Sequence, residues 1–349
     1  MAFVRRVRNG MSQAKLIQYG LVGVPLGMVM IGVLSLAYSV YAPNAESRDG
    51  GRDAAMLRAD VSEAALRAWV ETLANKIGPR PAQDEAKMRE TAKWIQSELG
   101  VENMGYKRVN VLTFPANGAE YRNVEVEIPG REKPAEIVIV GAHYDSVPGC
   151  PAANDNGSGV AALLALAKNF IGTENARTLR FVAFANEEPP NFQNETMGSL
   201  VYAKACKTRG DNVVAMISLE TMGYYDDKPR SQSFPPGLRR FYPDTGNFIG
   251  FVGNLKSKAL VERFHASFKR HSTFPAEKAS LPPALPGIGW SDHWSFWQAG
   301  YLALMVTDTA TFRYPHYHLP SDTPDKLDYP RFTAVVKGVA LVVKDLVNE

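Results

Sequence analysis

Short apolar runs alternate with helical patterns along most of this 349-residue chain, and this alternation constrains the fold more than any other feature. Strands that alternate with helices usually pair in parallel, because each helix returns the chain to the starting edge of the sheet. The predicted fold class is α/β, with a mostly parallel mixed central sheet and helices on both faces. We expect strands near residues 124–128, 136–142, 179–185, 213–219, 248–252 and 302–306, and helices near 61–77, 83–99, 157–170, 199–207, 256–271 and 329–347.

Polar residues follow three of these predicted strands directly. His143, Glu187 and Glu220 each come just after an apolar run. Ligands of open α/β sheets bind beyond the carboxyl ends of the strands, so we expect these three side chains to converge on one edge. The adjacent carboxylates Glu187 and Glu188 would be costly to place there without a partner.

Two short motifs carry residue types that bind metals. Residues 141–146 read Gly-Ala-His-Tyr-Asp-Ser, and residues 154–159 read Asn-Asp-Asn-Gly-Ser-Gly at the predicted start of a helix. Imidazole and carboxylate groups at fixed spacing indicate a metal site, and Zn²⁺ accepts both. The context of Ser158 is not that of a serine nucleophile elbow, and the small residues around it are expected to let the helix approach the metals. The pattern predicts a zinc-dependent hydrolase.

The N-terminal segment predicts a membrane anchor. No charged residue occurs between Leu16 and Pro43, and the run is long enough to cross a bilayer as a helix. Basic residues precede it, which predicts a cytoplasmic N-terminus and a periplasmic or extracellular catalytic domain. A cleavable signal peptide is the alternative. The expected organisation is a cytoplasmic basic tail (1–15), a transmembrane signal-anchor helix (16–42), a linker (43–58) and a zinc hydrolase domain (59–349), for which a family resemblance given below implies peptidase activity.

The charge balance gives no sign of a nucleic-acid partner. The net charge is +3, and four of the basic residues lie in the N-terminal tail. Without those four, the rest of the chain carries a net charge of about −1, so no basic face is expected.

The two cysteines and three of the histidines have no predicted part in the site. Cys150 and Cys206 are too few for a cysteine-rich zinc site, and the sequence does not settle whether they pair. His265 and His271 are expected on a solvated helix surface. His293 is expected in the core or in a hydrogen bond.

The order and spacing of these residues resemble the co-catalytic zinc aminopeptidases, whose relatives include glutamate carboxypeptidases and glutaminyl cyclases. The resemblance covers roughly residues 60–345, with Gly78-Pro79-Arg80 as an upstream marker. It implies a zinc exopeptidase-like fold and two zinc ions per chain. The chain departs from the family at Glu220, where an aspartate is common.

The resemblance also implies a role for each candidate ligand. His143 and Glu220 would hold one zinc ion. Glu188 and His318 would hold the other, and Asp155 would bridge both.

Further roles around the metals follow from the same resemblance. Asp145 would accept the second ring N–H of His143, and Asp292 would orient ligands from outside the metal site. Tyr317 would stabilise the oxyanion. His318 is preferred to the nearby His316 because the spacing to the following Asp-Thr matches the family. The peptide bond after Asp155 is expected to be cis.

The predicted function is a membrane-anchored aminopeptidase that releases N-terminal residues from peptides. Glu187 would act as general base on a hydroxide that bridges the zinc ions. The segments 225–247 and 272–290 are expected to shape the substrate pocket. Trp290, Trp294 and Trp297 are expected either to line this pocket or to pack in the core. Two alternatives remain: a glutaminyl-peptide cyclase, and a receptor-like ectodomain without activity. The oligomeric state is not predicted.

Overall fold

The computed structural model describes residues 60–349. The predicted basic tail, transmembrane helix and linker therefore lie outside the described residues. Within residues 60–349, no helix is both long and apolar enough to span a bilayer.

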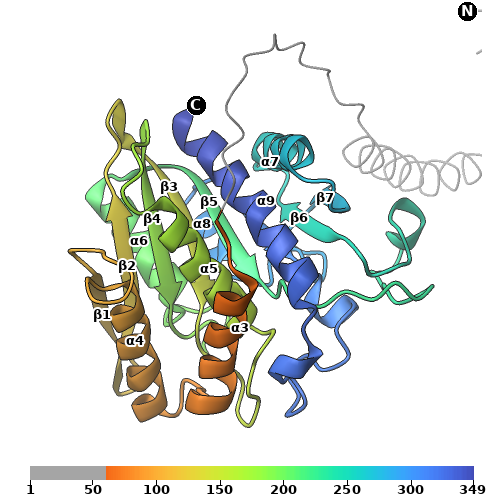
Figure 1. The fold of residues 1–349 in the computed structure, drawn as a ribbon, viewed down its shortest axis with the longest axis horizontal. Coiled ribbons are helices and arrows are strands. Elements are labelled where there is room, and N and C mark those ends of the chain that lie inside the picture. The colour runs from red at the N-terminus through yellow and green to blue at the C-terminus, as the bar shows by residue number, and fades with distance from the viewer. Residues whose placement is uncertain (1–59) are drawn as a thin grey trace, which may run out of the picture. The chain divides into compact units, whose positions relative to one another are not determined.

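A single eight-stranded mixed sheet forms the centre of the described domain (Figure 1). Its strands lie in the order β1-β2-β4-β3-β5-β8-β6-β7. Strands β4, β3, β5 and β8 run parallel, whereas β2 and β6 pair antiparallel to their neighbours β4 and β8. The predicted mostly parallel mixed sheet is confirmed. The strand bounds are β1 Asn110–Ala116, β2 Ala119–Ile128, β3 Lys133–His143, β4 Arg177–Phe184, β5 Asn212–Glu220, β6 Ile249–Gly253, β7 Ala276–Ser280 and β8 Ala303–Thr307.

Helices cover both faces of the sheet, as predicted. Helices α3, α4, α5, α7 and α9 lie on one face, and α6 and α8 lie on the other (Figure 1). The helix bounds are α3 Glu63–Glu71, α4 Glu85–Leu99, α5 Gly157–Phe170, α6 Gly198–Arg209, α7 Lys258–His271, α8 His293–Gln298 and α9 Tyr329–Asn348. A π-helical turn, Thr72–Ile77, continues α3, and short 3₁₀ turns occupy Arg239–Phe241, Ala310–Phe312 and Pro324–Lys326.

The alternation of side chains along β3 divides the core between the two faces. Val138 and Val140 belong to the larger apolar cluster, which includes α5 and α9. Ile137 and Ile139 belong to the smaller cluster beneath α6 and α8. Because the central strands are buried on both sides, they read in the sequence as continuous apolar runs.

The sequence did not predict the two edge strands. Strand β1 is only partly buried, and β7 has the sequence Ala-Glu-Lys-Ala-Ser. Neither contains the long apolar run of a central strand, so neither gives that signal.

The cysteines and two of the histidines occupy definite environments. Cys150 and Cys206 are both buried and free, so no disulfide joins them. The prediction for His265 was wrong, because this side chain is buried, with its Nε2 3.2 Å from the carbonyl oxygen of Ala276. His293 is buried as expected and contacts the carbonyl oxygen of Ile288 at 2.7 Å.

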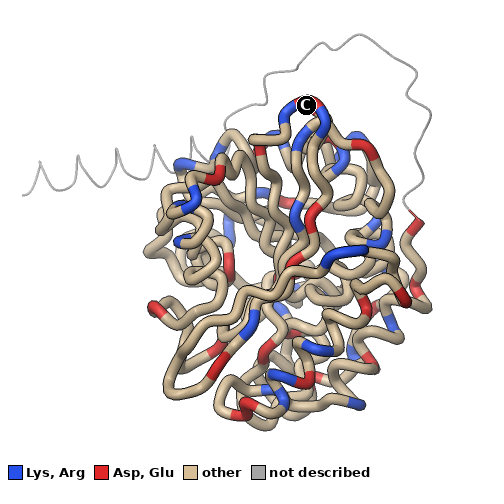
Figure 2. Tube along the Cα trace, turned by 90° about the vertical axis from the view of Figure 1, so that its left-hand side faces the viewer, with Lys and Arg blue, Asp and Glu red and all other residues tan. Residues whose placement is uncertain are grey.

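Basic and acidic residues are interspersed along the described trace (Figure 2). Many lie in pairs, such as Arg180 with Asp211 at 2.7 Å and Arg177 with Glu136 at 2.5 Å.

We expect Gly338→Ala to destabilise the domain, although alanine favours helices. A Cβ at this position of α9 would lie 2.4 Å from Cε2 of the fully buried Phe268 on α7. Overpacking of this kind costs about 1–3 kcal/mol, more than the gain in helix propensity of about 1 kcal/mol. Urea unfolding measures the effect. The double variant with Phe268→Leu should recover part of the loss, and an unchanged or higher midpoint for Gly338→Ala would contradict this packing.

Candidate metal centre

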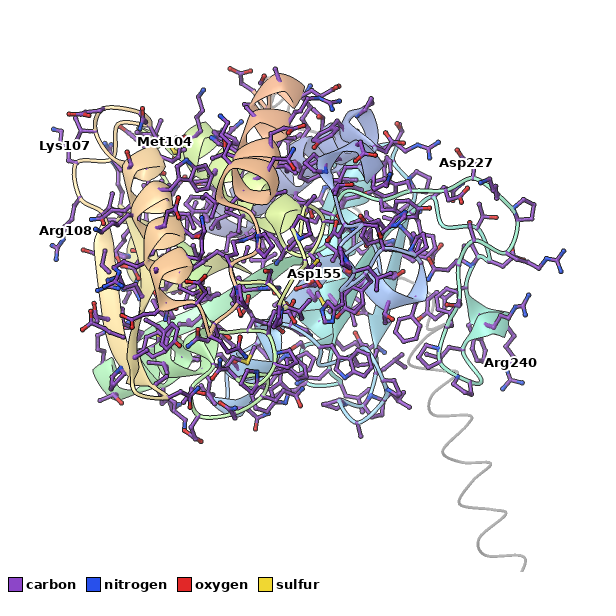
Figure 3. All side chains as sticks on the ribbon, turned by 90° about the horizontal axis from the view of Figure 1, so that it is seen from below. Met104, Lys107, Arg108, Asp155, Asp227 and Arg240 are labelled. Atoms are coloured by element: carbon purple, nitrogen blue, oxygen red, sulfur yellow. The ribbon has the colours of Figure 1, made fainter. Side chains whose placement is uncertain are left out.

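The candidate residues meet at the carboxyl edge of the central strands. His143 ends β3, Glu220 ends β5, and Glu187 follows β4. Asp155 lies just before α5, and His318 lies in the loop between β8 and α9. Figure 3 places Asp155 near the middle of the domain, between the side that carries α4 and the loop that carries Asp227 and Arg240.

Asp155 lies between two histidine–glutamate pairs. Its Oδ1 is 3.5 Å from His143 Nε2, which is 3.2 Å from Glu220 Oε2. Its Oδ2 is 3.0 Å from His318 Nε2, which is 3.2 Å from Glu188 Oε2. The ligand atoms of each group lie within 4.8 Å of one another. The predicted convergence of the five side chains is therefore present.

The chemistry of these atoms fits a pair of cations. All four carboxylates of the cluster, including Glu187, are buried. Glu188 Oε1 has no hydrogen-bond partner although this atom is buried. Two sets of one imidazole and two carboxylates, with a shared aspartate, are donors that zinc accepts. Each group can hold one metal ion.

Without a bound cation, the cluster strongly perturbs its own acid–base groups. Burial raises the pKa of Glu187 well above its ordinary value, and the neighbouring carboxylates add to this effect. Burial also raises the pKa of Glu188 to about 7. Burial opposes protonation of His318, but contacts with Asp155 and Glu188 outweigh it and raise the pKa to about 10. The cluster therefore needs positive charge, from protons or from metal ions.

Asp322 fixes the backbone that carries Asp155. Its two carboxylate oxygens accept the main-chain N–H groups of Asn154 (2.8 Å) and Asp155 (3.1 Å). The hydroxyl of Tyr314 donates to the same carboxylate at 2.7 Å. The Asp155–Asn156 peptide bond is cis, which confirms the prediction. The sequence suggested Asp322 only as part of a spacing pattern and gave it no role.

The start of α5 is tied to the end of β5. The side-chain oxygen of Asn156 accepts the N–H groups of Gly159 (3.0 Å) and Thr221 (3.2 Å). Ser158 donates its hydroxyl to Asn154 and accepts the N–H of Met222 at 2.8 Å. These bonds hold Asp155 and Glu220 at a fixed separation, and Ser158 serves as a structural residue here.

Asp145 contacts the glutamate pair more closely than it contacts His143. Its oxygens accept the main-chain N–H groups of Glu187 (3.0 Å) and Glu188 (2.9 Å). The distance from His143 Nδ1 to Asp145 Oδ1 is 3.4 Å, which is long for a hydrogen bond. Asp145 therefore positions the backbone of Glu187 and Glu188.

Ser291, the neighbour of Asp292, contacts the metal cluster directly, and the role expected of Asp292 stays a prediction. Asp292 is buried, but neither carboxylate oxygen has a hydrogen-bond partner among the described residues. Ser291 donates its hydroxyl to Glu220 Oε2 at 2.8 Å and contacts Ser218 at 2.9 Å. Burial raises the pKa of Asp292 to about 7. Ser291 thus orients Glu220 directly.

Tyr317 lies against the cluster, whereas His316 lies outside it. The Tyr317 ring stacks on His318, with ring centroids 3.9 Å apart. His316 contacts Ser321 at 2.9 Å and belongs to neither metal-binding group. The choice of His318 over His316 agrees with this geometry.

Arg80 holds the loop before Asp155 through hydrogen bonds to main-chain carbonyl oxygens. Its fully buried guanidinium donates to the carbonyl oxygens of Tyr144, Pro151 (2.8 Å) and Ala152 (3.0 Å). The sequence identified this residue only as part of an upstream marker, since its partners are main-chain atoms about 70 positions away.

Two cavities share one wall at the cluster. The acidic cavity is lined by Asp155, Glu187, Glu188, Pro189, Phe192, Glu220, Trp290, Tyr317 and His318. A second cavity, here called the apolar pocket, also contains Glu220, Trp290 and Tyr317 in its lining. Its apolar side chains include Phe234, Leu238, Phe248, Ile288, Met305 and Phe312. The segments 225–247 and 272–290 both contribute to this lining.

Comparison with known proteins assigns the family. Residues 123–343 match the model described as peptidase family M28. The chain belongs to peptidase family M28. This membership makes it a hydrolase that acts on peptides, and zinc is the metal that the family implies.

The chain is also similar to individual proteins. The chain is 36% identical to the uncharacterised protein YfbL of Escherichia coli strain K12, covering 78% of this chain and 85% of that one. It is 26% identical to a probable leucine aminopeptidase 1 of Trichophyton verrucosum, and the match covers 74% of this chain and 67% of that protein.

Solved structures share the fold. The zinc aminopeptidase BSAP of Bacillus subtilis superimposes with a TM-score of 0.67 at 15% identity, covering 83% of this chain and 96% of that one. A glutaminyl cyclase of Bacteroides thetaiotaomicron superimposes with a TM-score of 0.61 at 17% identity, covering 82% of this chain and 99% of that one. At these identities the likeness concerns the fold alone.

We expect zinc to stabilise the metal-stripped protein against heat. Zinc at about 100 times its Kd stabilises the folded state by about 2.7 kcal/mol, which corresponds to roughly 4–5 °C in Tm for a domain of this size. Replacing a ligand, as in His318→Asn, should remove much of this shift. His316→Asn is the matched control and should keep it. Equal shifts for the two variants in a thermal melt would contradict the ligand assignment.

Proposed function

We propose that the chain is a membrane-anchored zinc aminopeptidase that releases N-terminal residues from peptides. The observation that carries the proposal is Asp155, which shares its two oxygens between two histidine–glutamate pairs beside the acidic cavity. Family M28 membership supports the peptidase chemistry.

Two zinc ions would be held by the two groups that meet at Asp155. His143 and Glu220 would bind one ion, and Glu188 and His318 would bind the other. When bound, such ions activate a water molecule and polarise the substrate carbonyl. The four buried carboxylates also attract the positively charged α-amine of a peptide, which favours attack at its first peptide bond.

Glu187 would carry the proton during the reaction. It lines the acidic cavity, and its Oε2 is 3.9 Å from His143 Nε2. Asp145 holds its main chain, so its carboxylate is presented to the cavity. From this position it would accept a proton from water and then give it to the leaving amine. Tyr317, in the wall of both cavities, would stabilise the developing oxyanion.

The N-terminal segment would anchor the enzyme in a membrane. The uncharged run from Leu16 to Pro43 and the preceding basic residues support this proposal. The peptidase domain would then lie on the periplasmic or extracellular side.

We expect Glu187→Gln to abolish turnover without loss of metal. A general base contributes about 100- to 10,000-fold to rate, so kcat on aminoacyl-nitroanilides should fall by that factor. Zinc content, measured by elemental analysis, should stay at the wild-type value. An active variant would refute the base assignment. Cyclisation of a Gln-peptide by the wild-type protein, with no residue released, would instead indicate a glutaminyl cyclase.

Removal of residues 1–43 should release the protein from membranes. The full chain should remain in the membrane pellet after carbonate extraction, whereas the shortened chain should be found in the soluble fraction. The cleavage rate of a soluble nitroanilide should be the same for both. Full-length protein in the carbonate wash would contradict anchoring.

A further inference from the structure

A row of four paired residues crosses the apolar pocket from the metal centre to the edge of the sheet. Glu220 on β5 pairs with Thr307 on β8. Thr307 pairs with Gly250 on β6, which pairs in turn with Glu277 on β7. All four line the apolar pocket. Adjacent strands lie about 4.8 Å apart, so Glu277 is about 14 Å from Glu220 across the sheet.

The register directs Glu277 into this pocket. A Cβ on Gly250 would lie 3.8 Å from Cγ2 of Thr307, so Gly250 and Thr307 face the same side. Glu277, paired with Gly250, shares that face. The next residue along each strand, such as Phe251, faces α7 instead, where its ring contacts Phe264 at 5.0 Å between centroids. The small residues in the middle of the row leave the pocket open above them.

The charged residues in the lining of the apolar pocket are Glu220, Glu277 and Lys278. Glu277 and Lys278 are neighbours on β7, and because successive residues of a strand face opposite sides of the sheet, Lys278 directs its side chain away from that of Glu277. Among the described residues, no hydrogen bond or ion pair holds the carboxylate of Glu277. Burial raises the pKa of Glu277, and the charge of Lys269 opposes that effect. A partly desolvated carboxylate without a partner is costly, so a ligand that supplies a cation there would be favoured.

We propose that the apolar pocket binds an N-terminal lysine or arginine, and that Glu277 pairs with the cation at the end of its side chain. This inference rests on the aminopeptidase function proposed above. With the α-amine and carbonyl at the acidic cavity, the five side-chain bonds of lysine extend about 6 Å along the row. The substrate main chain and the Glu277 side chain span the rest of the distance of about 14 Å between Glu220 and Glu277. A leucine side chain would contact the apolar walls without reaching Glu277.

The test compares lysine with norleucine, which has the same aliphatic chain but no cation. The wild-type enzyme should cleave the lysine nitroanilide with the higher kcat/KM. Glu277→Gln should lower kcat/KM for lysine by roughly 10- to 100-fold, the value of a hydrogen bond to a charged group. The norleucine value should change less than about threefold. Glu174→Gln is the matched control, because this glutamate pairs with Arg131 before the amino end of β4, whereas the candidate site lies at the carboxyl ends of the central strands.

Calorimetric binding of lysinamide and norleucinamide to the zinc-loaded protein gives a second readout. If neither nitroanilide is cleaved, the proposed function fails, and binding alone decides the pocket assignment. Tighter binding of lysinamide that is lost in Glu277→Gln would support the assignment. A lysine-to-norleucine ratio that is the same in wild type and Glu277→Gln, by rate or by binding, would overturn it.

Discussion

Asp155 lies between two histidine–glutamate pairs. The contacts that hold the surrounding loops keep the negative charges of this cluster close together. Four buried carboxylates and two imidazoles lie together, with nitrogen–oxygen distances of 3.0–3.5 Å between each histidine and its nearest carboxylates. Like charges at this spacing repel strongly when water is excluded, so the carboxylates must take up protons or bind cations. Metal binding satisfies the same groups without protonating them. The shared carboxylate makes the two sites one structural unit, because a shift of Asp155 would alter both.

Three buried charged side chains hold this unit through main-chain atoms. Asp322 accepts the N–H of Asp155, and Asp145 accepts those of Glu187 and Glu188. Arg80 donates to the carbonyl groups of the preceding loop. Each satisfies its own hydrogen-bonding needs by fixing a loop, which reduces the cost of burial. The strands give each loop its starting point, and these contacts set its final geometry.

The sequence predicted the parts of the site that depend on local pattern. His143 and Glu220 were found because they follow apolar strands, and parallel strands bring their carboxyl ends together. Arg80 was missed because its partner Ala152 is 72 positions away and offers only a main-chain oxygen. The contact between Ser291 and Glu220 was also missed, because the two residues lie 71 positions apart and residue spacing does not reveal such a contact. Strand β7 was also missed, since a polar edge strand lacks an apolar run.

Anomalous diffraction at the zinc absorption edge, from crystals of the zinc-loaded protein, tests the central arrangement most directly. We expect two peaks, each beside a different carboxylate oxygen of Asp155. One peak should also contact His143 and Glu220, and the other Glu188 and His318. A single peak, or peaks that do not contact Asp155, would contradict a paired metal centre built on this residue.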